Sequence, residues 1–108
     1  MKKEELEDIY QFLAGYWYDR EEEDAAIVNE FVAEVDPQIA VKYADLIERF
    51  IASPESIRNK SEFIRKAVWR WFSPEEADAP IKWLEGILSL LKDAGIYYSE
   101  HEIPLSVR

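Results

Sequence analysis

Apolar residues recur at intervals of three and four along the first part of the chain, with polar residues between them. This spacing places the apolar side chains on one face of an α-helix, so it predicts a helix over residues 3–17. Gly15 lies near the end of this helix and is expected to break it locally. The predicted inward face consists of Leu6, Ile9, Tyr10, Leu13, Tyr16 and Trp17.

Two prolines mark the boundaries of the next helices. A second apolar stripe, over residues 27–35, predicts a helix that begins near Asp24 and stops at Asp36, because a residue before a proline avoids the α region. Pro37 then suits the first turn of a third helix. Pro54 repeats this stop-and-start pattern, so the third helix is expected to end before it and a fourth to follow. The third inward face is predicted to hold Ile39, Tyr43, Leu46, Ile47, Phe50 and Ile51.

A fourth helix is expected in two pieces. Ile57 is assigned to a short turn, whereas apolar residues from Phe63 to Trp71 have the spacing of a longer helical body. Asn59 or Ser61 is the expected cap between the two pieces, because both side chains can bond to free backbone N–H groups.

The end of the chain predicts one more helix and a tail. Pro80 opens the last helix, which is expected to end near Gly95, a residue suited to a helix C-cap. Residues 96–108 show no helical period and predict an extended tail, or at most one strand. Short connections imply antiparallel neighbours. The sequence therefore predicts an all-α fold, in which residues 1–108 form a single-domain bundle of about five amphipathic helices with an extended C-terminal tail.

The negative charge of the chain is unevenly placed. The net charge is −10, and residues 1–36 carry 12 of the 23 acidic residues but only 3 of the 13 lysines and arginines. Direct binding to nucleic acid is disfavoured, because it requires a basic face. An acidic face favours a basic partner and speeds encounter with it. The alternative interpretation is that the acidity only keeps the protein soluble.

The residues that usually carry catalysis are scarce. The chain has no cysteine, one histidine (His101, beside Glu100 and Glu102) and only three glycines, so it lacks a cysteine nucleophile and a glycine-rich phosphate loop. The run DREEED over residues 19–24 has no central glycine and is too short for an EF-hand loop. We predict no catalytic residue, metal or cofactor. A small enzyme that uses carboxylates alone remains an alternative.

Surplus aromatic residues suggest a binding surface instead. Trp69 and Trp71 lie two positions apart, which on a helix turns them about 200° from each other, so both cannot face one core. One of them is expected at the surface or under the following loop, unless the tail 96–108 folds over it. Trp17 could serve the core or the surface. The candidate binding residues are Tyr16, Trp17, Tyr18, Asp19, Glu21, Glu22, Glu23, Asp24, Trp69 and Trp71.

The N-terminus, MKKEELEDIY, has no apolar signal core, and no apolar run approaches the ~20 residues that a membrane span requires. We therefore expect a cytoplasmic protein that does not contact a membrane.

The stretch FLAGYWYDREEEDAAIVNEFVAE resembles the start of a helical family of immunity proteins from bacterial contact-dependent growth inhibition systems. That helical family opens with Phe-Leu-Gly-Gly-Tyr-Phe, followed by a polar, often acidic stretch and then an amphipathic helix. The resemblance covers about residues 6–91. Phe12, Leu13, Gly15 and Tyr16 match, with Ala14 and Trp17 at the other two positions, and the closing helix has the matching Pro80, Trp83 and Leu84.

This resemblance implies that the protein binds the toxic C-terminal domain of a contact-delivered effector in a 1:1 complex and neutralises it. A cytoplasmic antidote implies a cytosolic target, and toxins that cut nucleic acid are typically basic. We therefore expect the partner to be a basic nuclease, more specifically an RNase, whose active site is covered by the acidic and aromatic surface. The alternative is a generic acidic interaction adaptor or a homodimeric module.

Overall fold

Five α-helices are present in the computed structural model, which describes the backbone of residues 1–107 and the side chains of residues 1–94. The prediction of an all-α fold with about five helices is confirmed, and the described residues contain no strand. The helices are α1 (Lys3–Trp17), α2 (Asp24–Glu34), α3 (Pro37–Ala52), α4 (Ile57–Val68) and α5 (Ala79–Val107).

Proline and serine set most of the boundaries as the sequence predicts. Asp36 is extended before Pro37, which is the first residue of α3, and Ser53 is extended after its last residue. α1 agrees with the predicted range but continues through Gly15, so the predicted local break at this glycine is wrong. A glycine inside a helix costs only about 1 kcal/mol relative to alanine, which the surrounding turns can offset.

α4 differs from its prediction at both ends. It is a single helix, and its cap is Ser56, whose Oγ accepts a hydrogen bond from the Asn59 backbone N–H at 3.1 Å. Neither Asn59 nor Ser61 caps it. The helix stops at Val68, where the backbone of Trp69 turns into the left-handed region, so the predicted extension to Trp71 is wrong.

The last helix is longer than predicted. α5 runs through Gly95 to Val107, so the predicted end at Gly95 and the predicted extended backbone from residue 96 are wrong. One glycine does not stop a helix, since its cost is about 1 kcal/mol. Residue 108 lies outside the described residues.

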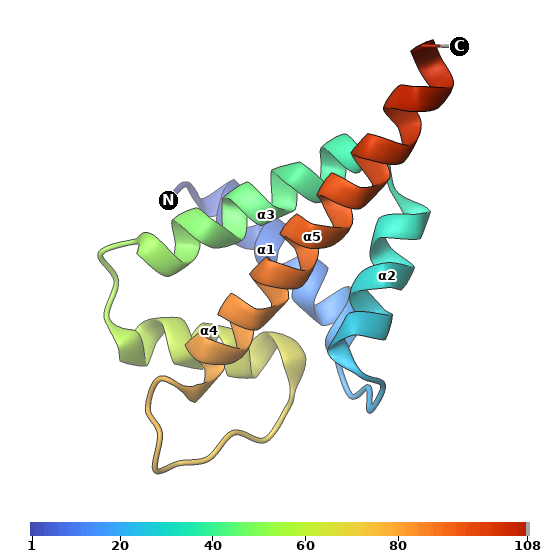
Figure 1. Ribbon diagram of the computed structural model, residues 1–108. Helices are drawn as coiled ribbons and strands as arrows, with labels where there is room; N and C mark the ends of the chain where they lie inside the picture. The colour runs from blue at the N-terminus through green and yellow to red at the C-terminus, as the bar shows by residue number, and fades with distance from the viewer. Residues whose placement is uncertain (108) are drawn as a thin grey trace.

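α5 crosses the front of the molecule and packs against α3, α2 and α4, while α1 lies behind it against α4 and α3 (Figure 1). The predicted inward faces supply most of the core, but Tyr10 and Ile39 are exposed. Tyr10 packs the edge of its ring on Phe63, and Ile39 lies in the first turn of α3. The largest fully buried side chains are Trp17, Ile9, Leu13, Ile27, Ile47, Ile64, Leu84, Ile87 and Leu91.

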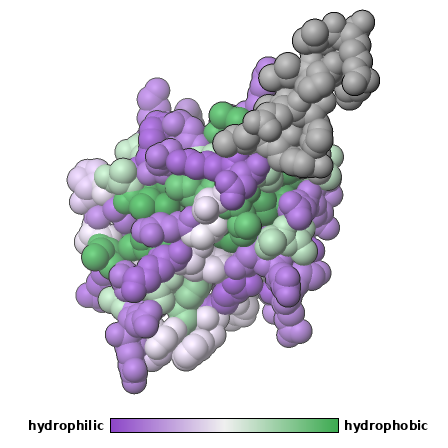
Figure 2. Space-filling view, in the orientation of Figure 1, coloured by the Kyte–Doolittle hydropathy of each residue, from purple (hydrophilic) through white to green (hydrophobic). Residues whose placement is uncertain are grey.

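The outer surface in this view is mixed. Figure 2 shows a band of hydrophobic residues across the middle of the face, bordered by hydrophilic residues. Among the described residues, no helix combines the length and the apolar character needed to cross a bilayer.

Candidate docking surface

Asp24 joins three separate segments of the chain at the start of α2. Its Oδ1 accepts hydrogen bonds from Trp17 Nε1 at 3.1 Å and Arg70 Nη1 at 3.2 Å. Its Oδ2 accepts one from Trp83 Nε1 at 3.0 Å. These donors come from the end of α1, the loop between α4 and α5, and the first turns of α5. The Asp24 carboxylate, predicted to bind a partner, is therefore engaged within the protein.

The donors of Asp24 also pack on one another. The Arg70 guanidinium lies 5.3 Å from the centre of the Trp83 ring, and the rings of Trp17 and Trp83 meet edge to face at 5.7 Å. Trp17 is only 1% exposed, which decides between its two predicted roles in favour of the core. In this conformation Trp17 has no surface to offer a partner, because α1 points its ring inward against α5.

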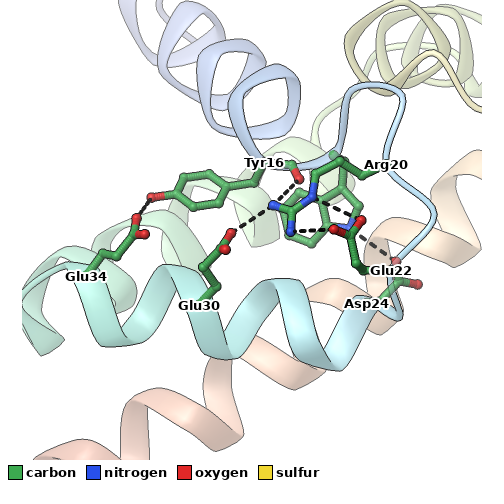
Figure 3. Close-up of polar contacts among 7 residues, drawn as sticks. Tyr16, Arg20, Glu22, Asp24, Glu30 and Glu34 are labelled. Atoms are coloured by element: carbon green, nitrogen blue, oxygen red, sulfur yellow. Dashed lines mark hydrogen bonds and ion pairs between the residues drawn. The ribbon is translucent and has the colours of Figure 1, made fainter.

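Arg20 ties the loop between α1 and α2 to its surroundings. Its guanidinium contacts Glu22 at 3.1 Å and Glu30 at 2.8 Å, and it donates to the backbone oxygen of Tyr16 at 3.2 Å (Figure 3). The hydrogen bond from Arg20 lowers the pKa of Glu22. Glu22, another predicted binding residue, is therefore already paired.

Tyr16 is held by α2. Its hydroxyl donates to Glu34 Oε2 at 2.8 Å (Figure 3). Burial, followed by the hydrogen bond to Glu34, raises the pKa of Tyr16 to about 12. Tyr16 also packs on Phe12 and Phe31. The Tyr16 side chain therefore packs within the fold and does not project from the surface as a binding residue would.

Three aromatic side chains in the loops that follow α1 and α4 are exposed. Trp69 is 69% exposed, Trp71 is 79% exposed and Tyr18 is 52% exposed. The rings of Tyr18 and Trp69 stack at 6.2 Å although they come from different loops. Both tryptophans are exposed because α4 ends before them, and α5 leads the chain away from their loop (Figure 1). The prediction that one of the two tryptophans lies at the surface is confirmed, and the second is exposed as well. The alternative, in which the tail folds over the surface tryptophan, is wrong.

Exposed carboxylates follow Tyr18 directly. Asp19, Glu21 and Glu23 are exposed and have no ion pair with any described residue. We call the six residues that the structure leaves available the aromatic–acidic surface: Tyr18, Asp19, Glu21, Glu23, Trp69 and Trp71.

The two non-glycine residues with positive φ among the described residues both belong to this surface. Asp19 has φ 53° and Trp69 has φ 50°. Aspartate tolerates this region, but for most residues the left-handed conformation costs about 1–2 kcal/mol. Backbone strain of this kind concentrates at functional sites. The left-handed turn at Trp69 is the C-cap of α4, in which the Trp69 backbone N–H donates to the Arg65 carbonyl oxygen at 3.0 Å. Its side chain, in contrast, is exposed.

An open pocket borders the surface. Its volume is about 590 Å³, and it is lined by Arg65, Trp69, Arg70, Trp71, Phe72 and Pro74. Four of these residues were not predicted as site residues. No sequence pattern indicated them, because the apolar spacing predicts a helix through Trp71, whereas α4 ends at Val68 and a loop brings these residues together.

Among the side chains described, no group of three or more histidine, aspartate or glutamate residues is placed to hold a metal ion. No protein family profile, curated protein or solved structure matches the chain. The resemblance to the immunity family therefore stays a prediction.

Proposed function

We propose that the protein is an immunity protein that binds and neutralises the C-terminal toxin domain of a contact-dependent growth inhibition effector. The observation that carries the proposal is the aromatic–acidic surface. In it the exposed Trp69 stacks on Tyr18, and the carboxylates of this surface, which follow Tyr18 in the chain, have no ion pair with any described residue. The proposed partner is a basic nuclease domain, more specifically an RNase, bound 1:1 in the cytoplasm with its active site covered.

The two parts of the surface have different physical roles in this proposal. Exposed tryptophans lose apolar contact with water when a partner covers them, and such residues are frequent hot spots of protein interfaces. The carboxylates of Asp19, Glu21 and Glu23 attract a basic surface at long range, which mainly raises the association rate. Buried anchors mainly set the lifetime of the complex.

The internally bonded residues support the surface from below. Asp24 fixes the loop that holds Trp69 and Trp71 by bonding Arg70, and Arg20 fixes the acidic loop by pairing Glu22 and Glu30. The proposal therefore assigns Tyr16, Trp17, Glu22 and Asp24 to positioning, in place of the direct contact predicted from the sequence.

Charge reversal at Glu21 and Glu23 tests the proposal. The proposed partner is the C-terminal toxin domain of an effector whose gene is expected immediately upstream. The measured quantity is the association rate constant at several salt concentrations. We expect the variant with both glutamates changed to lysine to associate more slowly at low salt, with a weaker salt dependence. The matched control reverses Glu4 and Glu7, exposed residues at the far end of α1. Equal association rate constants in the test and control variants would show that the acidic loop is not part of the interface.

Self-association is the second candidate, because an exposed tryptophan can equally pack on another copy. Sedimentation velocity at several concentrations separates the two candidates. A dimer that dissociates when Trp71 is changed to alanine favours the homodimeric module, whereas a monomer at all concentrations favours a separate partner.

A further inference from the structure

The pocket beside the aromatic–acidic surface has the opposite charge from the rest of the protein. The chain carries a net charge of −10, yet the residues that line the pocket include Arg65 and Arg70 and no carboxylate. The pocket is thus a local cationic site on an acidic molecule. A partner that contacts both the cationic pocket and the acidic loop must carry a negative group opposite the pocket and positive groups opposite the loop.

The two arginines are not equivalent. Arg70 is engaged by Asp24 and lies over the Trp83 ring, so its charge is partly compensated. Arg65 makes no side-chain hydrogen bond or ion pair with any described residue. It lies one helical turn before Trp69, in the last turn of α4. Arg65 therefore offers an uncompensated guanidinium at the wall of an aromatic pocket.

We infer that this pocket receives a carboxylate side chain, adjacent to an aromatic residue, from the protein partner. A guanidinium can donate two parallel hydrogen bonds to a carboxylate, and the faces of Trp69 and Trp71 supply apolar contact for the neighbouring ring. The inference rests on the proposed function for the identity of the partner as a protein, and it deepens that function by fixing the orientation in which the partner docks.

A polyanion is the less favoured occupant. A nucleic acid strand brings a charge with every phosphate. Tyr18 stacks on Trp69 of the pocket wall, and the exposed carboxylates Asp19, Glu21 and Glu23, which have the same sign as phosphate, follow Tyr18 in the chain. A single carboxylate on a polypeptide carries one charge, which Arg65 can meet alone. The remaining surface of the partner can then be basic and face the acidic loop.

Three capped dipeptides test the inference on the full chain without any toxin. Acetyl-Phe-Asp-amide, acetyl-Phe-Asn-amide and acetyl-Phe-Lys-amide differ mainly in charge, and their binding is followed by the indole N–H signals of Trp69 and Trp71 in NMR spectra. We expect the Asp peptide to bind most tightly and the Lys peptide least. The expected difference between Asp and Asn is about fivefold, the value of one charge pair at close range in water.

Arg65→Gln should abolish this preference, and Arg65→Lys should keep part of it. The control is Arg58→Gln, an exposed arginine of the same helix whose loss changes the net charge equally. Tighter binding of the Lys peptide, an unchanged preference in Arg65→Gln, or no shift of either indole signal would overturn the inference. Displacement of the Asp peptide by a short oligothymidylate would assign the pocket to nucleic acid instead. None of these outcomes depends on the toxin, so they are distinct from a failure of the charge-reversal test.

Discussion

The indole N–H of Trp83 donates to the Asp24 carboxylate at 3.0 Å, across 59 residues of sequence. This bond joins the start of α5 to the start of α2. Because the same carboxylate also accepts from Trp17 and Arg70, it fixes the loop after α4 against the loop after α1. Tyr18 and Trp69 meet at that junction, so Asp24 lies beneath the proposed docking surface and holds its two halves together.

Removal of the Asp24 carboxylate should destabilise the fold. Asp24→Ala leaves two indole donors and one guanidinium without their acceptor, and hydrogen bonds to charged groups contribute about 1.5–3 kcal/mol each. Since the Asp24 side chain is 31% exposed and water can replace part of the loss, we expect a decrease of about 2 kcal/mol in the free energy of unfolding. Urea denaturation measures it, with Glu21→Ala as an exposed control. A change no larger than the control's would refute the structural role.

Position 69 should prefer glycine to alanine. In the left-handed region an L-residue is about 1 kcal/mol less favourable than glycine, so Trp69→Gly should be more stable than Trp69→Ala by about that amount. Comparing the two variants by urea denaturation isolates the backbone, because both remove the indole. If alanine is the more stable of the two, Trp69 is not strained in solution.

Position 15 should show the opposite order. Gly15 is helical within α1, and a Cβ atom added there meets no atom within 4 Å. Alanine should therefore raise the free energy of unfolding by about 0.5–1 kcal/mol. Thermal unfolding followed by circular dichroism measures the change. A loss of stability in Gly15→Ala would show that α1 is interrupted there, as the sequence alone predicted.

Tyr16 should ionise later than an ordinary tyrosine. Its pKa is raised to about 12, by burial first and by the bond to Glu34 second, whereas a tyrosine in the unfolded chain has a pKa near 10. Neutral Tyr16 therefore contributes stability that is complete below about pH 10 and is lost as the pH rises through 12. The stability of the native chain should fall more steeply over that range than that of Tyr16→Phe.

Absorbance of tyrosinate follows the same ionisation directly. Glu34→Gln should shift the ionisation of Tyr16 to lower pH, because it removes the negative charge beside the hydroxyl. Identical titration curves for the native chain and Glu34→Gln would exclude this contact. Burial also raises the pKa of Tyr43, so Tyr16→Phe is needed to assign the late step.

Proline positions and apolar spacing predicted the helix boundaries that depend on neighbouring residues alone. Pro37 sets the start of α3 and apolar spacing defines α1, so both were foreseen. The end of α4 was missed, because neither glycine nor proline stands at position 69 and the apolar spacing continues through Trp71. The helical path of α5 beyond Gly95 was missed because a glycine permits a helix end without requiring it.

The candidate site was predicted in outline, and its internal bonding was not. The chain order places Tyr18 beside the acidic run, and both were identified. The role of Asp24 depends on donors that lie up to 59 residues away, and no local pattern in the sequence indicates such a meeting. Arg65 was missed because the pocket is formed by the end of α4 together with the loop that follows it, and the sequence predicted a continuous helix there.

The lifetime of the proposed complex with a toxin domain tests the central claim most directly. Trp71 is 79% exposed, so Trp71→Ala should leave the free energy of unfolding unchanged while removing an anchor. We expect the dissociation rate constant to rise by about tenfold or more, as loss of a hot spot of about 2 kcal/mol requires. Val41→Ala, an exposed apolar change on α3, serves as the control. A dissociation rate in Trp71→Ala equal to that of the control would contradict the account.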